Sequence, residues 1–147
     1  MNLYKTQIIQ FIVMMLVGIA FNPMNILAFR FTDLYLSTTL VYGGILMASN
    51  MIWAHEIVHY FSMNHFNKYL FGVGVALSVA VSIFLLRTQF LVDDNQWLKR
   101  MISHHSTALT TSHNIYKKTS NPSIKKLAKD IIETQEREIK LMKSLIN

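Results

Sequence analysis

The chain has 147 residues, a formal net charge of +6 and no cysteine, and apolar residues make up 52% of it while charged residues make up only 15%. The absence of cysteine excludes disulfides, thiolate zinc sites and cysteine nucleophiles. The charged residues are concentrated in the last third, which indicates a membrane-embedded first part and a polar second part.

Three apolar segments are long enough to cross a bilayer, which needs about 20 residues. They run from about residue 8 to 29, from about 34 to 61 and from about 69 to 86. We therefore predict an all-α protein in which residues 1–88 form a membrane region with three transmembrane helices and residues 89–147 form a helical hairpin domain. The positive-inside tendency predicts a cytoplasmic C-terminal region. It rests on Arg30, Arg87, Lys99 and Arg100, which lie near span ends on the hairpin's side.

Methionine and histidine recur at every fourth position along the second predicted span, at Met47, Met51, His55, His59 and Met63. Side chains four residues apart stack on one face of a helix. Imidazole and thioether are suitable copper ligands, and thioether favours Cu(I). We predict metal ligation by Met51, His55, His59 and Met63. The alternative is that the histidines lie at the membrane interface, where polar groups cost little.

The same span contains His55-Glu56-Ile57-Val58-His59, which matches the H-E-x-x-H pattern of zinc proteases. In that pattern the two histidines bind zinc and the glutamate activates water. A small intramembrane zinc hydrolase is therefore an alternative function. It would need a third ligand, for which Asp33 is a poor substitute.

Two amphipathic helices account for the sequence after Arg87. The first begins at Asp93 or Asp94 and runs to about Lys118, and Asn121-Pro122 caps and begins the second. A short break between two such helices implies an antiparallel hairpin. Folding the chain at this break places His105 opposite Gln135, and Met101 opposite Glu138 and Ile139.

A second cluster of possible metal ligands lies in this hairpin. Met101, His104 and His105 lie within about one turn, and folding brings Met142 near Met101. They predict copper binding, with zinc as the alternative metal. The competing interpretation is that both methionines fill the core.

The hairpin also bears on the expected partners. Its lysines are not interleaved with aromatic residues, so we expect no nucleic acid, and attraction to anionic lipid is the simpler interpretation. Since two helices bury little by themselves, we expect a homo-oligomer of four helices or docking on the membrane helices.

The hairpin carries the pattern D-x(6)-M-x-x-H-H-x-x-A, followed by P-x(4)-L-A-x-x-I-I-x-x-Q-x-x-E-I-x-x-M, over residues 94–142. It resembles the family catalogued as domain of unknown function three-hundred-and-five. This resemblance implies a ferritin-like helical topology and an association with copper. Arg87-Thr88-Gln89 and Thr111-Ser112 are similar to its membrane-anchored branch.

Two residues depart from the family pattern. Ser103 stands where members usually have proline, which we expect to change little beyond the local helix. Thr111 stands where soluble members often have methionine, so one possible soft ligand is missing. The leading hypothesis is a membrane-anchored copper-binding protein that is not an enzyme. A structural module that oligomerises through the hairpin is the second hypothesis, and the zinc hydrolase is the third.

Overall fold

The computed structural model describes residues 3–146, and it contains helices and no strand within that range. The elements in chain order are α1 (Leu3–Ala20), α2 (Pro23–Ile26), the 3-10 turn η1 (Phe31–Asp33), α3 (Thr38–Met63), α4 (Lys68–Ala80), the π-helical turns η2 (Val81–Arg87), α5 (Asp94–Lys118) and α6 (Pro122–Leu145). The prediction of an all-α fold is confirmed.

The chain divides into two compact units. The first consists of Met1–Phe21 and Thr38–Leu91, and the second consists of Asn22–Ser37 and Val92–Asn147. The predicted boundary after residue 88 lies close to the break between Leu91 and Val92. The second unit also contains residues 22–37, which the sequence placed in the membrane region.

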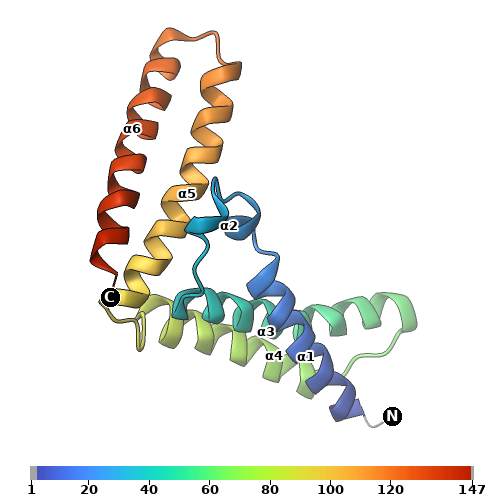
Figure 1. Ribbon diagram of the computed structural model, residues 1–147. Coiled ribbons are helices and arrows are strands. Elements are labelled where there is room, and N and C mark those ends of the chain that lie inside the picture. Colours follow the sequence, from blue (N-terminus) through green and yellow to red (C-terminus); the bar gives the residue numbers. More distant parts are fainter. Residues whose placement is uncertain (1–2, 147) are drawn as a thin grey trace. The chain divides into compact units, whose positions relative to one another are not determined.

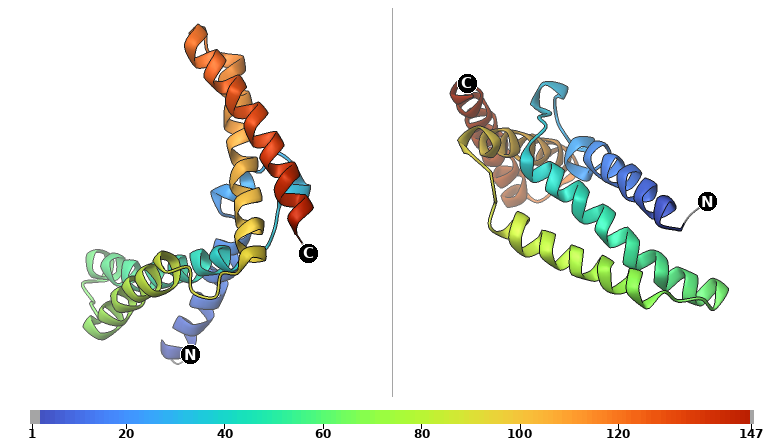
Figure 2. Two further views of the ribbon diagram at one scale, coloured as in Figure 1. Left: turned by 90° about the vertical axis from the view of Figure 1, so that its left-hand side faces the viewer. Right: turned by 90° about the horizontal axis from the view of Figure 1, so that it is seen from below.

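In the first unit α3 packs against both α1 and α4 (Figure 2). Gly44 and Gly74 allow this close packing. A Cβ at Gly44 would lie 2.6 Å from Cγ1 of Ile19, and one at Gly74 would lie 2.8 Å from the backbone nitrogen of Trp53. Gly43 and Gly72 would meet nothing within 4 Å, so only one glycine of each neighbouring pair lies at a close helix contact.

Two helical stretches in the described residues are long and apolar enough to cross a membrane, Lys5–Ile26 and Lys68–Arg87. The prediction of three such helices is therefore not supported. The helix α3 is not one of the two, since its C-terminal half contains His55, Glu56 and His59.

The helix boundaries differ from the predicted spans at two places. The first predicted span is interrupted after Ala20, because Asn22 caps a new short helix that begins at Pro23. The second begins at Thr38 and not at residue 34.

In the second unit α5 and α6 lie side by side as an antiparallel hairpin (Figure 1). Oδ1 of Asp93 accepts a hydrogen bond from the Gln96 N–H at 2.7 Å and caps α5. Oδ1 of Asn121 accepts from the Ser123 N–H at 2.9 Å and caps α6. Both caps and the hairpin agree with the sequence prediction, because these side chains satisfy N–H groups that a helix start leaves free.

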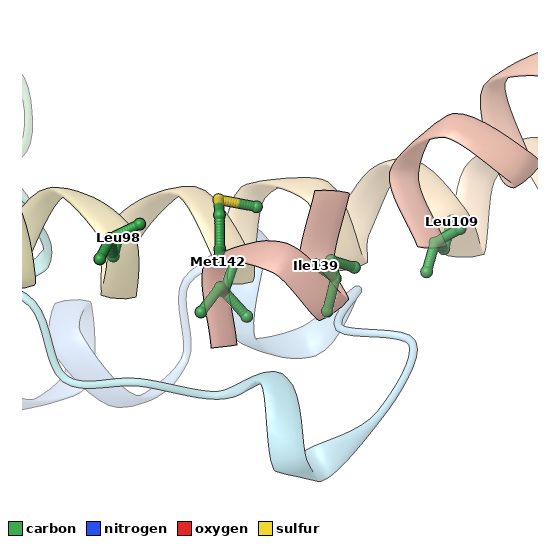
Figure 3. Close-up of a cluster of buried hydrophobic side chains, with 5 residues drawn as sticks. Leu98, Leu109, Ile139 and Met142 are labelled. Carbon is green, nitrogen blue, oxygen red and sulfur yellow. The ribbon is translucent and has the colours of Figure 1, made fainter. Parts of the chain in front are cut away.

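The core of the hairpin is a cluster of buried apolar side chains (Figure 3), formed by Leu98, Ile102, Leu109, Ile139 and Met142. Partly buried apolar side chains pack against this cluster, and one of them, Tyr35, comes from the 22–37 segment. The hairpin therefore shares its core with a segment that lies far from it in the sequence.

Candidate metal centres

Two imidazoles lie together near the C-terminal end of α3. The ring centroids of His55 and His59 are 4.2 Å apart, and His65, in the following loop, lies 6.4 Å from His59. Nδ1 of His55 is buried and has no hydrogen-bond partner. Because a buried polar atom without a partner is costly, this nitrogen is available for a proton or a metal ion.

Glu56, between the two histidines, makes a buried structural hydrogen bond. Its side chain is only 3% exposed, and Oε2 accepts a hydrogen bond from the Asn67 N–H at 2.9 Å. Oε1 lies 4.0 Å from Nδ1 of His55, which is too far for a hydrogen bond. The carboxylate therefore anchors the α3–α4 loop, and this geometry does not favour the water-activating role of a zinc hydrolase.

The three methionines that recur at four-residue intervals with these histidines lie in different surroundings. The Met47 sulfur packs against Gly18 of α1, 2.9 Å from where a Cβ of that glycine would lie. Met51 is partly buried, and Met63 is 69% exposed. Within this row the two histidine rings are thus the side chains that lie close together, and Met51 and Met63 lie one turn before and after them.

The second pair of histidines lies in the middle of α5. Nδ1 of His105 is 3.1 Å from Oε2 of Glu138 on α6, and the ring centroids of His104 and His105 are 5.9 Å apart. Burial lowers the pKa of His105, which outweighs the opposing effect of the Glu138 carboxylate. A neutral imidazole is the form that binds metal ions.

The His105–Glu138 contact joins side chains whose helix positions lie about one turn apart when His105 is opposite Gln135, as predicted. Helical side chains lean toward the N-terminus of their own helix. In an antiparallel pair His105 and Glu138 therefore lean toward each other.

The two methionines predicted as hairpin ligands take part in packing. Met142 is a member of the buried core and Met101 packs against that core, in agreement with the predicted proximity of the two methionines. Among residues 3–146, no three histidine, aspartate or glutamate side chains are grouped so that they could hold one metal ion. One copy of the chain thus offers pairs of imidazoles with neighbouring thioethers or a carboxylate.

A buried carboxylate that the sequence did not single out as a partner of the hairpin holds the second unit together. Asp33 is fully buried, and its side chain accepts hydrogen bonds from Oγ of Ser106 at 2.7 Å and from Nζ of Lys143 at 2.6 Å. Oγ of Ser106 in turn accepts from the Phe29 N–H at 2.9 Å. Arg30 pairs with Glu136 on α6 at 2.6 Å.

Ser103 also binds the 22–37 segment. Its hydroxyl donates to the backbone carbonyl of Asp33 at 2.9 Å and accepts from the Tyr35 N–H at 3.4 Å. The expectation that a serine here changes little beyond the local helix was therefore wrong. A proline at this position could make neither bond.

The comparisons with known proteins identify the hairpin. Residues 86–146 match the model of a family described as a domain of unknown function (DUF305). An "Uncharacterized protein L153" from Acanthamoeba polyphaga mimivirus is 32% identical over 127 residues, which cover 86% of this chain and 82% of the viral protein. No solved structure matches the chain. The family predicted from the sequence pattern of the hairpin is confirmed, and the chain belongs to the DUF305 family.

Proposed function

We propose that this protein is a membrane-anchored, non-enzymatic copper-binding protein that uses histidine and methionine ligands. The observation that supports this proposal best is the His55–His59 pair, with ring centroids 4.2 Å apart and a buried Nδ1 that lacks a hydrogen-bond partner. Two imidazoles from successive turns of one helix are a common basis for a metal site. The remaining positions on the metal would be open to a thioether or to a ligand from outside.

Copper is preferred over zinc because of the neighbouring sulfur atoms. Met51 and Met63 each lie four residues from a histidine of the pair, and the exposed Met63 is free to turn toward it. Thioethers select Cu(I), whereas zinc sites use imidazole, carboxylate and thiolate. Zinc at the same histidines is the alternative metal.

The hairpin offers a second pair of ligands. His104 is exposed and His105 is partly buried, so at least one imidazole is accessible from solvent. Met101 lies on the same side of α5 as these rings, one turn before His105. Met142 is the weakest of the predicted ligands, because its side chain is already enclosed by the core.

Membrane anchoring would use the two apolar stretches Lys5–Ile26 and Lys68–Arg87. Large apolar side chains are exposed along both, including Ile8, Leu16, Val73 and Phe84. Lipid is a suitable solvent for such surfaces. By its composition α3 is not one of these two stretches, but it packs against α1 and α4, its 26 residues are long enough, and its polar Ser49 and Glu56 are buried by protein. We therefore propose it as a third span. With this topology, the positive-inside tendency would place the hairpin on the cytoplasmic side.

Copper titration of the full-length protein in detergent tests the proposal. The double variant His55→Ala/His59→Ala should lose one bound copper, measured in competition with a chelator of known affinity. His113→Ala is the matched control, because His113 belongs to neither pair and stacks on Phe29 at 4.7 Å. If the native protein binds no copper, or if the double variant binds as much as the control, the site on α3 is wrong.

A further inference from the structure

One face of the hairpin is left without a partner by the contacts of the second unit. The 22–37 segment binds the side of α5 and α6 that presents Ser103, Ser106 and Lys143. The opposite side presents a row of positions on each helix. On α5 they are Trp97, Met101, His104, Ala108, Thr111 and Ile115, and on α6 they are Leu127, Ile131, Thr134, Glu138, Leu141 and Leu145. We call these twelve positions the open face.

The spacing of the open face is that of helices that pack in bundles. In both rows the steps alternate between four and three residues, which is the a/d pattern of knobs-into-holes packing. None of the twelve residues is buried in the structure, and Trp97, Leu127, Leu141 and Leu145 are each more than half exposed. Large apolar side chains are therefore presented to an absent neighbour in a packing pattern.

The distribution of charge points to the same conclusion. The helices α5 and α6 contain ten lysines and arginines, and none of them lies on the open face. Its only formally charged residue is Glu138, which contacts His105. A solvated helix face would not be expected to exclude basic residues in such a basic hairpin, whereas the centres of protein interfaces are depleted of them.

The register of the hairpin shows what fits this face. Because side chains of antiparallel helices lean toward each other, the His105–Glu138 contact pairs the two rows by their side chains, Trp97 with Leu145, His104 with Glu138, and Ile115 with Leu127. A groove of about 670 Å³ lined by Trp97 and Leu145, among others, lies at one end of the face. A two-fold axis along the hairpin sets α5 of one copy against α6 of another at the same level. Apolar residues then meet apolar residues, and histidine meets glutamate.

We propose that the open face docks on the open face of a second copy of this chain, so that His104 of each copy meets Glu138 of the other in a four-helix bundle. In this arrangement all neighbouring helices are antiparallel, as in an up-down-up-down bundle. In this arrangement the N-terminus of α5 also lies at the same end of the bundle in both copies. Two chains anchored in one membrane require this, because only residues 88–93 separate η2 from α5.

The second copy would also complete a set of ligands. One copy supplies His104 and His105, and the second copy supplies the carboxylate of Glu138 next to His104. This sharing of ligands rests on the proposed metal-binding function, whereas the docking itself does not. The test is therefore carried out in the presence of a metal chelator, so that the two proposals can fail separately.

The absence of cysteine from the chain allows a direct test by cross-linking. Two full-length chains with different tags are co-expressed, one with Ala108→Cys and the other with Thr134→Cys, and are treated in detergent with a short bismaleimide. We expect several-fold more of the mixed dimer than from a control pair in which Thr110→Cys replaces Ala108→Cys. Thr110 is nearly level with Ala108 but lies about 200° around the helix.

Equal cross-linking of the two pairs would overturn the proposal, as would a monomer by light scattering. A monomer would point to the open face being covered by another part of the same chain. If the Ala108→Cys and Thr134→Cys chains cross-link while the native protein binds no copper, the docking stands and the metal-binding function fails. The variant Ala108→Arg gives a second readout, because it should convert the dimer to a monomer without loss of helical circular dichroism.

Discussion

The carboxylate of Asp33 lies 2.6 Å from the ammonium group of Lys143, although the two residues are 110 positions apart in the sequence. The aspartate is fully buried, whereas the lysine side chain is 31% exposed. This pair, together with Ser103 and Ser106, makes the 22–37 segment part of the hairpin unit. The hairpin is therefore not simply appended after the apolar helices in the sequence.

Loss of the Lys143 ammonium should destabilise the protein. The variant Lys143→Met leaves Asp33 buried without its cation, and breaking a buried pair in this way costs about 3 kcal/mol or more. Denaturant unfolding followed by circular dichroism measures the change. The control is Lys140→Met, since Lys140 is an exposed lysine on the same helix. Equal stability of the two variants would show that the pair does not hold the segment.

The Ser106 hydroxyl should contribute independently of the lysine. The variant Ser106→Ala removes a donor to Asp33 and an acceptor for the Phe29 N–H, and unsatisfied buried groups cost about 1–3 kcal/mol. Thr107→Ala is the neighbouring control, because the Thr107 hydroxyl bonds only locally to the carbonyl of His104. Limited proteolysis near residue 30 should increase in the first variant only. Unchanged protease resistance would contradict the contact.

In the first unit, alanine substitutions at glycines that are close neighbours in the sequence should differ in their effect on stability. Gly74→Ala places a methyl group 2.8 Å from the backbone nitrogen of Trp53, and overpacking of this kind costs about 1–3 kcal/mol. Gly72→Ala meets nothing within 4 Å and should be neutral or slightly stabilising. Thermal unfolding in detergent compares the two. Gly44 and Gly43 form a second such pair on α3, and the same order is expected for them.

Stability should also depend on the protonation of His105. Burial lowers its pKa in the folded protein, and the nearby His104 lowers it further, whereas the Glu138 carboxylate raises it. Between the folded pKa and the ordinary value of about 6.5 the unfolded chain binds more protons, so stability rises with pH. The stabilisation is complete above about pH 6.5 and is lost as the pH falls through the folded pKa. Unfolding from about pH 7 to about pH 5 should show this slope, and His105→Gln should flatten it.

The local features of the fold could be predicted from the sequence, because their causes are local. The caps at Asp93 and Asn121 and the end of α5 at Lys118 follow from side chains within a few residues. The role of Asp33 could not be predicted in this way, since Ser106 and Lys143 lie 73 and 110 residues away. One signal was present, because a single acid between two long apolar segments needs a partner.

The candidate sites show the same division. Spacing alone predicted that His55 and His59 lie on one helix face, and their rings are neighbours. Spacing could not show that Glu56 is committed to the Asn67 N–H, because this bond depends on the path of the loop after α3. Likewise, a core position for Met142 depends on the packing of both helices.

X-ray absorption spectroscopy of the copper-loaded, full-length protein tests the central claim most directly. Copper bound as proposed should show imidazole scattering together with a sulfur neighbour. Both should decrease in His55→Ala/His59→Ala, and the sulfur contribution alone should decrease in Met51→Leu/Met63→Leu. A spectrum with only oxygen neighbours, or one that neither pair of substitutions changes, would contradict the proposal that this protein holds copper on α3.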